Sequence, residues 1–127
     1  MARVTVVNDN DDFLNLMGDI LEMNGHTAAP VRGAEASIEA IARTEPDVLI
    51  VDLRLSDARL LDDGWALIVG ARAHPRLRDV PIVICTADVE LLNARADEIA
   101  ALADVHSLAK PFRLDDVETL LAQVLSR

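Results

Sequence analysis

The sequence predicts an α/β fold in which a five-stranded parallel sheet carries five helices on its two faces. Two observations predict this fold. Short runs of β-branched and other apolar residues alternate along the chain with segments of helical periodicity. The run Val48-Leu49-Ile50-Val51 is apolar at every position, as in a strand that is buried on both faces of a parallel sheet. The chain of 127 residues suits a single domain, expected over residues 1–127.

The first half of the chain predicts three strands and two helices. The expected strands are residues 4–7, 27–31 and 46–52, and the expected helices run from near Asp11 to Gly25 and from Ala34 to Arg43. In the first helix, apolar residues recur at helical spacing: Phe13, Leu16, Met17, Ile20 and Leu21.

The second half predicts the remaining two strands and three helices. The expected strands are residues 81–85 and 107–109. The third helix follows Gly64-Trp65 and ends near His74-Pro75, the fourth runs from Asp88 to about Ala103, and the fifth runs from Arg113 to Leu125. An inward stripe is expected on the fifth helix at Leu114, Val117, Leu120, Leu121 and Val124.

Composition excludes several classes of function. The net charge of −10 argues against direct nucleic-acid binding and against anionic membranes, because both need a basic surface. The single cysteine, Cys85, cannot form an internal disulfide, which favours a reducing compartment. No apolar run approaches the roughly 20 residues of a membrane span, and the amino-terminus lacks the long apolar region of a signal peptide. We therefore expect a soluble cytoplasmic protein.

Polar side chains follow the predicted strands. Asn8 and Asp9 follow the first, Asp52 the third, Thr86 the fourth and Lys110 the fifth. The carboxyl ends of parallel strands share one edge of a sheet, so these side chains should converge. An aspartate pair with a carbonyl and waters suits Mg²⁺, and a lysine with a hydroxyl suits a phosphoryl group. Asp52 could then act as the nucleophile that forms an aspartyl phosphate.

The motifs around these residues resemble those of the receiver domain of two-component response regulators, of the kind seen in the chemotaxis regulator. The resemblance covers essentially the whole chain and implies a flavodoxin-like (βα)5 fold with strand order 2-1-3-4-5. It rests on residues 6–9, 46–52, 63–65, 81–87 and 108–112, which read VVND, PDVLIVD, DGW, PIVICTA and LAKPF.

The resemblance also implies a role for each matching residue. Asp52 matches the phosphoacceptor, Thr86 the hydroxyl that bonds the phosphoryl oxygen, and Lys110 the lysine that pairs with the phosphoryl group. The implied Mg²⁺ ligands are Asp9, Asp52, the backbone carbonyl of Arg54 and, through water, Asn8.

The chain departs from the family pattern in four places. Asn8 replaces the usual second acid, so weaker Mg²⁺ binding is expected. Ser107 stands where the family often has an aromatic residue that swings inward on activation. The segment from Asp52 to Gly64 is longer than usual, and the segment from Thr86 to Lys110 is slightly long. A further hypothesis pairs Arg54 with Asp88 across the mouth of the site.

Two functions remain open from the sequence. The first is a phosphorylatable receiver that accepts a phosphoryl group from a histidine kinase or histidine phosphotransfer protein and signals through protein contacts. Its expected output surface is the face of the fourth helix, fifth strand and fifth helix, on a monomer or weak homodimer. The second is a degenerate receiver that binds proteins without phosphorylation. A stretch cut from a longer hybrid protein would look the same.

Enzyme classes fit less well. A haloacid-dehalogenase-type phosphatase needs a second aspartate two residues after the nucleophile, and this chain has Arg54 there. A dinucleotide-binding protein would show a Gly-rich loop after the first strand. We therefore expect no conventional enzyme, only a phosphoacceptor that catalyses its own phosphotransfer and dephosphorylation.

Overall fold

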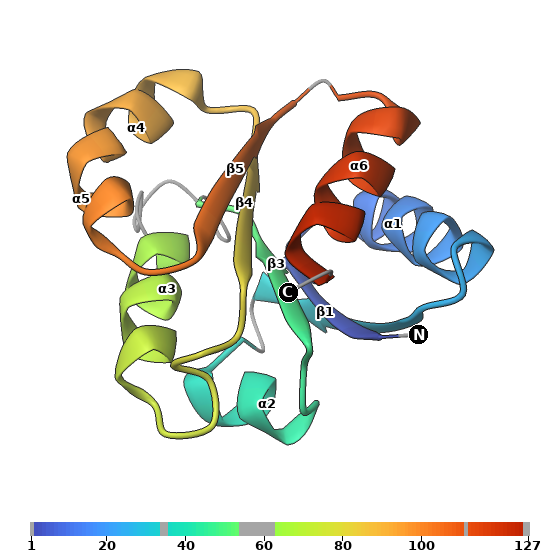
Figure 1. Cartoon of the computed structure of the whole chain (residues 1–127), viewed down its shortest axis with the longest axis horizontal. Coiled ribbons are helices and arrows are strands. Elements are labelled where there is room, and N and C mark those ends of the chain that lie inside the picture. The colour runs from blue at the N-terminus through green and yellow to red at the C-terminus, as the bar shows by residue number, and fades with distance from the viewer. Residues whose placement is uncertain (1, 34–35, 54–62, 111, 126–127) are drawn as a thin grey trace.

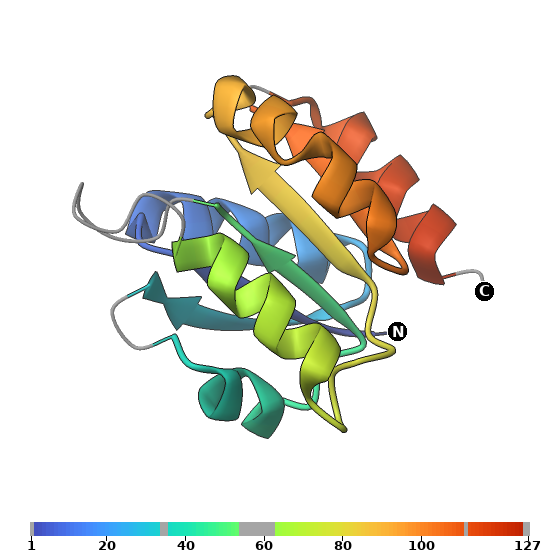
Figure 2. The same cartoon turned by 90° about the vertical axis from the view of Figure 1, so that its left-hand side faces the viewer.

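The computed structural model confirms the predicted parallel sheet. It describes residues 2–33, 36–53, 63–110 and 112–125. Five parallel strands lie in the order β2-β1-β3-β4-β5, as the resemblance implies. Their bounds are β1 Arg3–Asn8, β2 Thr27–Arg32, β3 Val48–Val51, β4 Ile82–Thr86 and β5 Val105–Ala109. The strands point the same way, so their carboxyl ends meet along one edge of the sheet (Figure 2).

Helices cover both faces of this sheet (Figure 1). Their bounds are α1 Asp11–Met23, α2 Ile38–Arg43, α3 Asp63–Ala73, α4 Val89–Ala94, α5 Ala96–Ala101 and α6 Leu114–Leu125. Helices α1 and α6 pack on one face through a core that includes Met17, Leu21 and Leu121. Helices α2 and α3 pack on the other through Ile41 and Ile68, with α4 and α5 against the same core. Each strand therefore divides its apolar side chains between two cores.

Two helix predictions were wrong in detail. The second helix begins at Ile38 and not at Ala34, because the Ser37 side chain caps it by accepting a hydrogen bond from the Ala40 N–H at 3.0 Å. The expected fourth helix is two short helices, which meet at Arg95. Arg95 has φ −98° and ψ 4°, outside the ideal helical values. The chain thus has six helices in its described part, and not five.

The buried faces of α1 and α6 differ from the predicted apolar stripes at two leucines. Leu16 in α1 is 54% exposed, and Leu14 is buried in its place. Leu14 lies three residues before Met17, on the inward side of the helix, whereas Leu16 lies on the outward side. Leu114 is the first residue of α6 and is 41% exposed, while Val117 and later members of that stripe pack inward.

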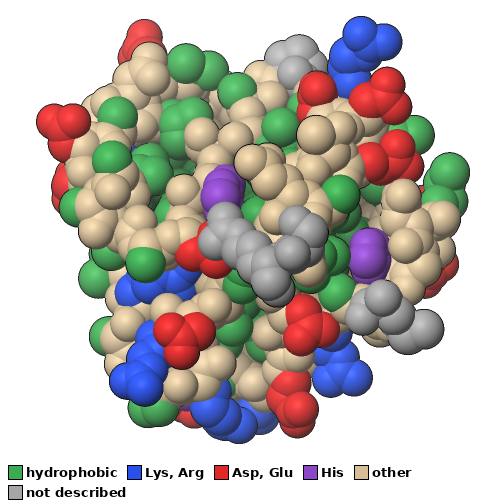
Figure 3. All heavy atoms as spheres, in the orientation of Figure 1, with side chains coloured by type: hydrophobic (Ala, Val, Ile, Leu, Met, Phe, Trp, Pro, Cys, Tyr) green, Lys and Arg blue, Asp and Glu red, His purple; other side chains and the backbone are tan. Residues whose placement is uncertain are grey.

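The surface carries many of the charged residues that make up 27% of the chain. Acidic and basic side chains are interspersed on the face shown in Figure 3. None of the helices within the described ranges has the length and apolar character that crossing a membrane requires.

Candidate functional site

Strand register brings the predicted residues to one place. Val7 of β1 lies beside Val51 of β3, so Asn8 and Asp52 leave adjacent strands at the same level. Thr86 of β4 pairs with Ala109 of β5, which puts Lys110 one residue beyond that pair. The expected convergence of these side chains therefore follows from the register of four neighbouring strands.

Asp52 lies at the centre of this group. It is only 8% exposed, and a buried carboxylate is costly unless other groups compensate its charge. The Lys110 ammonium provides that compensation, with Nζ 3.1 Å from Oδ2 of Asp52. The side-chain amide of Asn8 donates a longer hydrogen bond, at 3.5 Å, to the same oxygen. A lysine and an amide thus hold one carboxylate oxygen of Asp52.

The orientation of Asn8 follows from its neighbour. Its Oδ1 accepts a hydrogen bond from the Asn10 backbone N–H at 2.9 Å, which directs its nitrogen toward Asp52. Asn8 is 2% exposed, so few other arrangements are available to it. The residue acts here as a neutral donor to Asp52, which a carboxylate at this position could not do.

Thr86 borders an open hollow beside Asp52. The hollow has a volume of about 280 Å³ and is lined by Asp52, Thr86, Ala87 and Asp88. The Thr86 hydroxyl accepts a hydrogen bond from the Asp88 N–H at 3.1 Å, and the Asp88 side chain in turn caps α4 by accepting from the Leu91 N–H at 2.9 Å. The hollow is therefore a place where a small group could reach both Asp52 and Thr86.

One aromatic ring, that of Phe13, lies against Lys110, and the ring of Phe112 lies against that of Phe13. The Lys110 Nζ is 4.2 Å from the centroid of the Phe13 ring. Phe112 meets Phe13 edge to face, with ring centroids 6.2 Å apart. From its spacing along the chain, Phe13 was expected only in the inward stripe of its helix. The local sequence holds no signal for the contact with Lys110, which the fold creates.

Gly64 lets helix α3 approach the site. A Cβ at this position would lie 1.9 Å from the carbonyl oxygen of Asp52 and 2.7 Å from Cα of Leu53. The Gly64 N–H donates to the Leu53 carbonyl at 3.0 Å. The backbone that carries Asp52 is therefore held directly against the start of α3, at a distance that only glycine permits.

Cys85 precedes Thr86 and is 1% exposed. Burial raises the pKa of its thiol to about 12; the Lys110 charge opposes this rise, and the Asp52 charge adds to it. A thiol of this kind is an inert core group.

The remaining predicted residues lie around this centre or outside the described ranges. Asp9 is exposed at the end of β1, one residue beyond Asn8. Arg54 lies outside the described residues, as does most of the long segment after Asp52, so the structure does not place its carbonyl or its expected pairing with Asp88. Ser107 is exposed on the edge strand β5, and the neighbouring His106 contacts Asp104 at 2.8 Å.

The donor set suits a hard divalent cation. Asp9 and Asp52 supply two carboxylates near one edge of the sheet, and Mg²⁺ is commonly bound by one or two carboxylates together with waters. Within the described ranges, no cluster of three or more His, Cys, Asp or Glu side chains could hold a metal by itself. A cation here would therefore depend on water and backbone oxygen for its other ligands.

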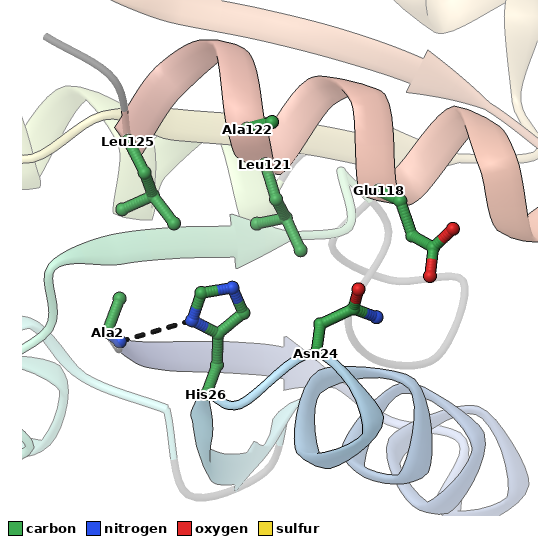
Figure 4. A pocket seen from close by; sticks show the side chains of 7 residues that line it. All are labelled: Ala2, Asn24, His26, Glu118, Leu121, Ala122 and Leu125. Carbon is green, nitrogen blue, oxygen red and sulfur yellow. Dashed lines mark hydrogen bonds between the residues drawn. The ribbon is translucent and has the colours of Figure 1, made fainter.

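A second hollow lies far from this edge. It has a volume of about 380 Å³ and lies between α6 and the segments near the starts of β1 and β2 (Figure 4). His26 faces it and accepts a hydrogen bond from the Ala2 N–H at 3.1 Å. Its other lining residues are Asn24, Glu118, Leu121, Ala122 and Leu125. None of the predicted site residues lines it, so the candidate site is the hollow beside Asp52.

Comparisons with known proteins agree with this geometry. The chain is 28% identical over 123 residues to the nitrogen assimilation regulatory protein NtrX of Azorhizobium caulinodans, covering 96% of this chain and 26% of that protein. It is 33% identical over 109 residues to the sensory/regulatory protein RpfC of Xanthomonas campestris, covering 86% of this chain and 14% of that protein. The chain thus spans 26% of the length of the first of these relatives and 14% of the length of the second.

A solved structure supports the same fold. The receiver domain of a sensor histidine kinase from Pseudomonas aeruginosa superposes with a TM-score of 0.79 at 24% identity, covering 99% of this chain and 98% of that one. That structure is described with a magnesium ion coordinated in its active site cleft.

The family profile gives the assignment. Residues 4–122 match the response regulator receiver domain. This match covers nearly the whole chain, and the sheet order and the side chains at the carboxyl edge agree with it. The chain therefore belongs to the receiver domain family of two-component signalling.

Proposed function

We propose that residues 1–127 form a single phosphorylatable receiver domain that accepts a phosphoryl group on Asp52. The observation that carries the proposal is the 3.1 Å contact between Lys110 and a buried Asp52 beside an open hollow. The Asp52 carboxylate borders that hollow. Its neighbours Lys110 and Thr86 carry an ammonium and a hydroxyl, which can stabilise the negative charge of a phosphoryl group during its transfer.

Each side chain has a definite part in the transfer. An oxygen of Asp52 attacks the phosphorus atom while the bond from phosphorus to the donor's nitrogen or oxygen breaks, and the donor leaves with that electron pair. The Lys110 ammonium and the Thr86 hydroxyl lie where they could contact the phosphoryl oxygens. Mg²⁺, held by Asp9 and Asp52 with the carbonyl of Arg54, would offset negative charge when bound.

Asn8 belongs to this proposal with a changed part. The resemblance to receiver domains implies that the residue at position 8 contacts Mg²⁺ through water. In this structure the Asn8 side-chain oxygen instead accepts a hydrogen bond from the Asn10 N–H, and its nitrogen donates one to Asp52. We propose that Asn8 mainly steadies the carboxylate and that Mg²⁺ binds more weakly than it would beside a second acid.

The proposed partners follow from the family. Receiver domains are signalling modules rather than conventional enzymes. The proposed donor is a histidine kinase or a histidine phosphotransfer protein, and the proposed output is a protein bound at the face of α4, α5, β5 and α6. Two of these helices begin with an exposed apolar residue, Val89 in α4 and Leu114 in α6, at 46% and 41% exposure.

The test is the intact mass of the protein after incubation with acetyl phosphate and Mg²⁺. The proposal predicts the addition of one phosphoryl group, which is lost in Asp52→Asn and greatly reduced when Mg²⁺ is chelated. A folded protein that gains no mass would contradict it and would favour the alternative, a receiver that binds partners without phosphorylation.

A further inference from the structure

Lys110 is the only lysine in the chain; every other basic residue among the 12 counted as Lys or Arg is an arginine. The single lysine lies at the candidate site, in contact with Asp52. Lysine has a flexible four-carbon stem, so its ammonium reaches a useful position only if neighbouring groups hold it there. Besides Asp52, the ring of Phe13 contacts this ammonium.

We infer that Phe13 is a positioning residue for Lys110 and that Phe112 holds Phe13 in place. The inference rests on the proposed function, because positioning matters only if Lys110 meets a phosphoryl group. The Lys110 Nζ lies 3.1 Å from Oδ2 of Asp52 and 4.2 Å from the centre of the Phe13 ring. The ammonium thus contacts both a carboxylate and the face of an aromatic ring.

The ring itself has a defined support. Phe13 lies in the first turn of α1, and the Asn10 side chain caps that helix by accepting from the Phe13 N–H at 3.1 Å. Phe112 meets the ring at an interplanar angle of 90°, the edge-to-face arrangement that aromatic pairs favour. One phenylalanine of the chain therefore contacts its single lysine, and the other contacts the first phenylalanine.

An aromatic face suits this task better than a second carboxylate would. Cation–π attraction is directed at the whole ring face, so the ammonium can shift from Asp52 toward a phosphoryl oxygen without losing the contact. A second acid would instead pair with the ammonium and compete with the phosphoryl group for it. Phe13 thus restricts Lys110 while leaving its charge available.

The single lysine makes the placement directly measurable. Protein produced with ¹³C-labelled lysine gives one side-chain Hε–Cε signal in an NMR spectrum, and protons above a ring face are shifted upfield. We expect an upfield shift of this signal in the native protein, its loss in Phe13→Leu, and its retention in Phe13→Tyr, which keeps the ring.

The functional consequence is measured with acetyl phosphate and Mg²⁺. Phe13→Leu should lower the rate of phosphoryl addition about three- to tenfold, the range expected for losing one cation–π contact at a partly exposed site. Phe13→Tyr should retain the native rate. Phe112→Leu, which leaves Phe13 present but less supported, should show a smaller decrease. Leu16→Ala, on the exposed side of the same helix, is the matched control and should change neither readout.

The two proposals fail in different ways. A native rate in folded Phe13→Leu, or a Lys110 signal without an upfield shift in the native protein, would overturn the positioning role while leaving Asp52 as the acceptor. An absence of phosphoryl addition in the native protein would overturn the proposed function, while the NMR signal would still test where Lys110 lies.

Discussion

The side-chain nitrogen of Asn8 lies 3.5 Å from Oδ2 of Asp52 and donates a hydrogen bond to it. The Asn10 N–H fixes this orientation by donating to the Asn8 oxygen at 2.9 Å. This hydrogen bond adds to the stabilisation that the Lys110 ammonium gives the buried Asp52 carboxylate. Because Asn8 is neutral where a second acid would be charged, the site should bind Mg²⁺ with only modest affinity.

Asn8→Asp should therefore strengthen Mg²⁺ binding by about tenfold, or about 1.4 kcal/mol, because it adds a second negative charge beside Asp52. Without Mg²⁺ the same variant should be less stable than the native protein, since two carboxylates would then face each other. Binding can be followed by calorimetry, or by fluorescence of the single tryptophan, Trp65, which adjoins Gly64. Asn24→Asp adds the same charge at the opposite edge of the sheet and should leave the affinity unchanged. Equal affinities for native protein and Asn8→Asp would contradict the account of this pair.

Gly64→Ala should destabilise the protein by about 3 kcal/mol or more. The new Cβ would lie 1.9 Å from the Asp52 carbonyl oxygen, so the backbone of the site or the start of α3 must move. Urea unfolding measures the change. Gly18→Ala is the matched control: its Cβ meets nothing closer than 4.0 Å, and it should be neutral or stabilising by up to about 1 kcal/mol, as expected within a helix. A native stability for Gly64→Ala would show that α3 does not press on Asp52.

Thr86→Val should cost about 1–2 kcal/mol of stability, because the half-buried Asp88 N–H loses the hydroxyl that accepts its hydrogen bond. Thr86→Ser keeps the hydroxyl and should lose less. If Thr86 contacts the phosphoryl group, the valine variant should still gain a phosphoryl group, but Trp65 fluorescence should respond less to its addition than in the serine variant. An equal response in both variants would remove Thr86 from the proposed contact.

Cys85 predicts a dependence of stability on alkaline pH. Burial holds the pKa of the folded thiol at about 12, against 9.0 for the ordinary thiol. Between these values the unfolded chain loses the thiol proton while the folded chain keeps it, so the free energy of unfolding should fall as pH rises above about 9. The slope from this group approaches about 1.4 kcal/mol per pH unit.

The comparison that isolates this effect is urea unfolding from about pH 8 to pH 11 for native protein and Cys85→Ala. The chain has no tyrosine and one lysine, so few other groups titrate in this range. The alanine variant should lose most of the slope. Parallel pH profiles for the two proteins would show that Cys85 is not the cause.

Local sequence predicted β3 and β4 well because each is a short apolar run bounded by polar residues. The predicted start of β5 was two residues late, because His106 and Ser107 interrupt the apolar pattern of that strand. Local sequence also predicted the convergence of Asp52, Thr86 and Lys110 because parallel strands share an edge. The break at Arg95 was not predictable in this way. No glycine or proline marks it, and the Arg95 guanidinium lies 5.0 Å from the ring of Trp65, a contact between distant parts of the chain.

The finer chemistry of the site also depends on contacts that the local pattern does not contain. The sequence alone does not determine which of the two orientations the Asn8 amide adopts; the hydrogen bond from the Asn10 N–H determines it in the folded protein. The sequence pattern indicates only that Phe13 belongs to the apolar stripe of a helix, and the fold brings its ring against Lys110. Residue types at strand ends thus predict which groups meet, whereas their orientations come from tertiary packing.

Asp52 is the carboxylate proposed to accept the phosphoryl group, and locating the modified residue tests this role most directly. Protein treated with acetyl phosphate and Mg²⁺ is reduced with borohydride, which converts an aspartyl phosphate to homoserine, and its peptides are then sequenced by mass spectrometry. The account predicts homoserine at position 52 and unmodified Asp9 and Asp88. Homoserine at either of those positions, with Asp52 intact, would contradict it.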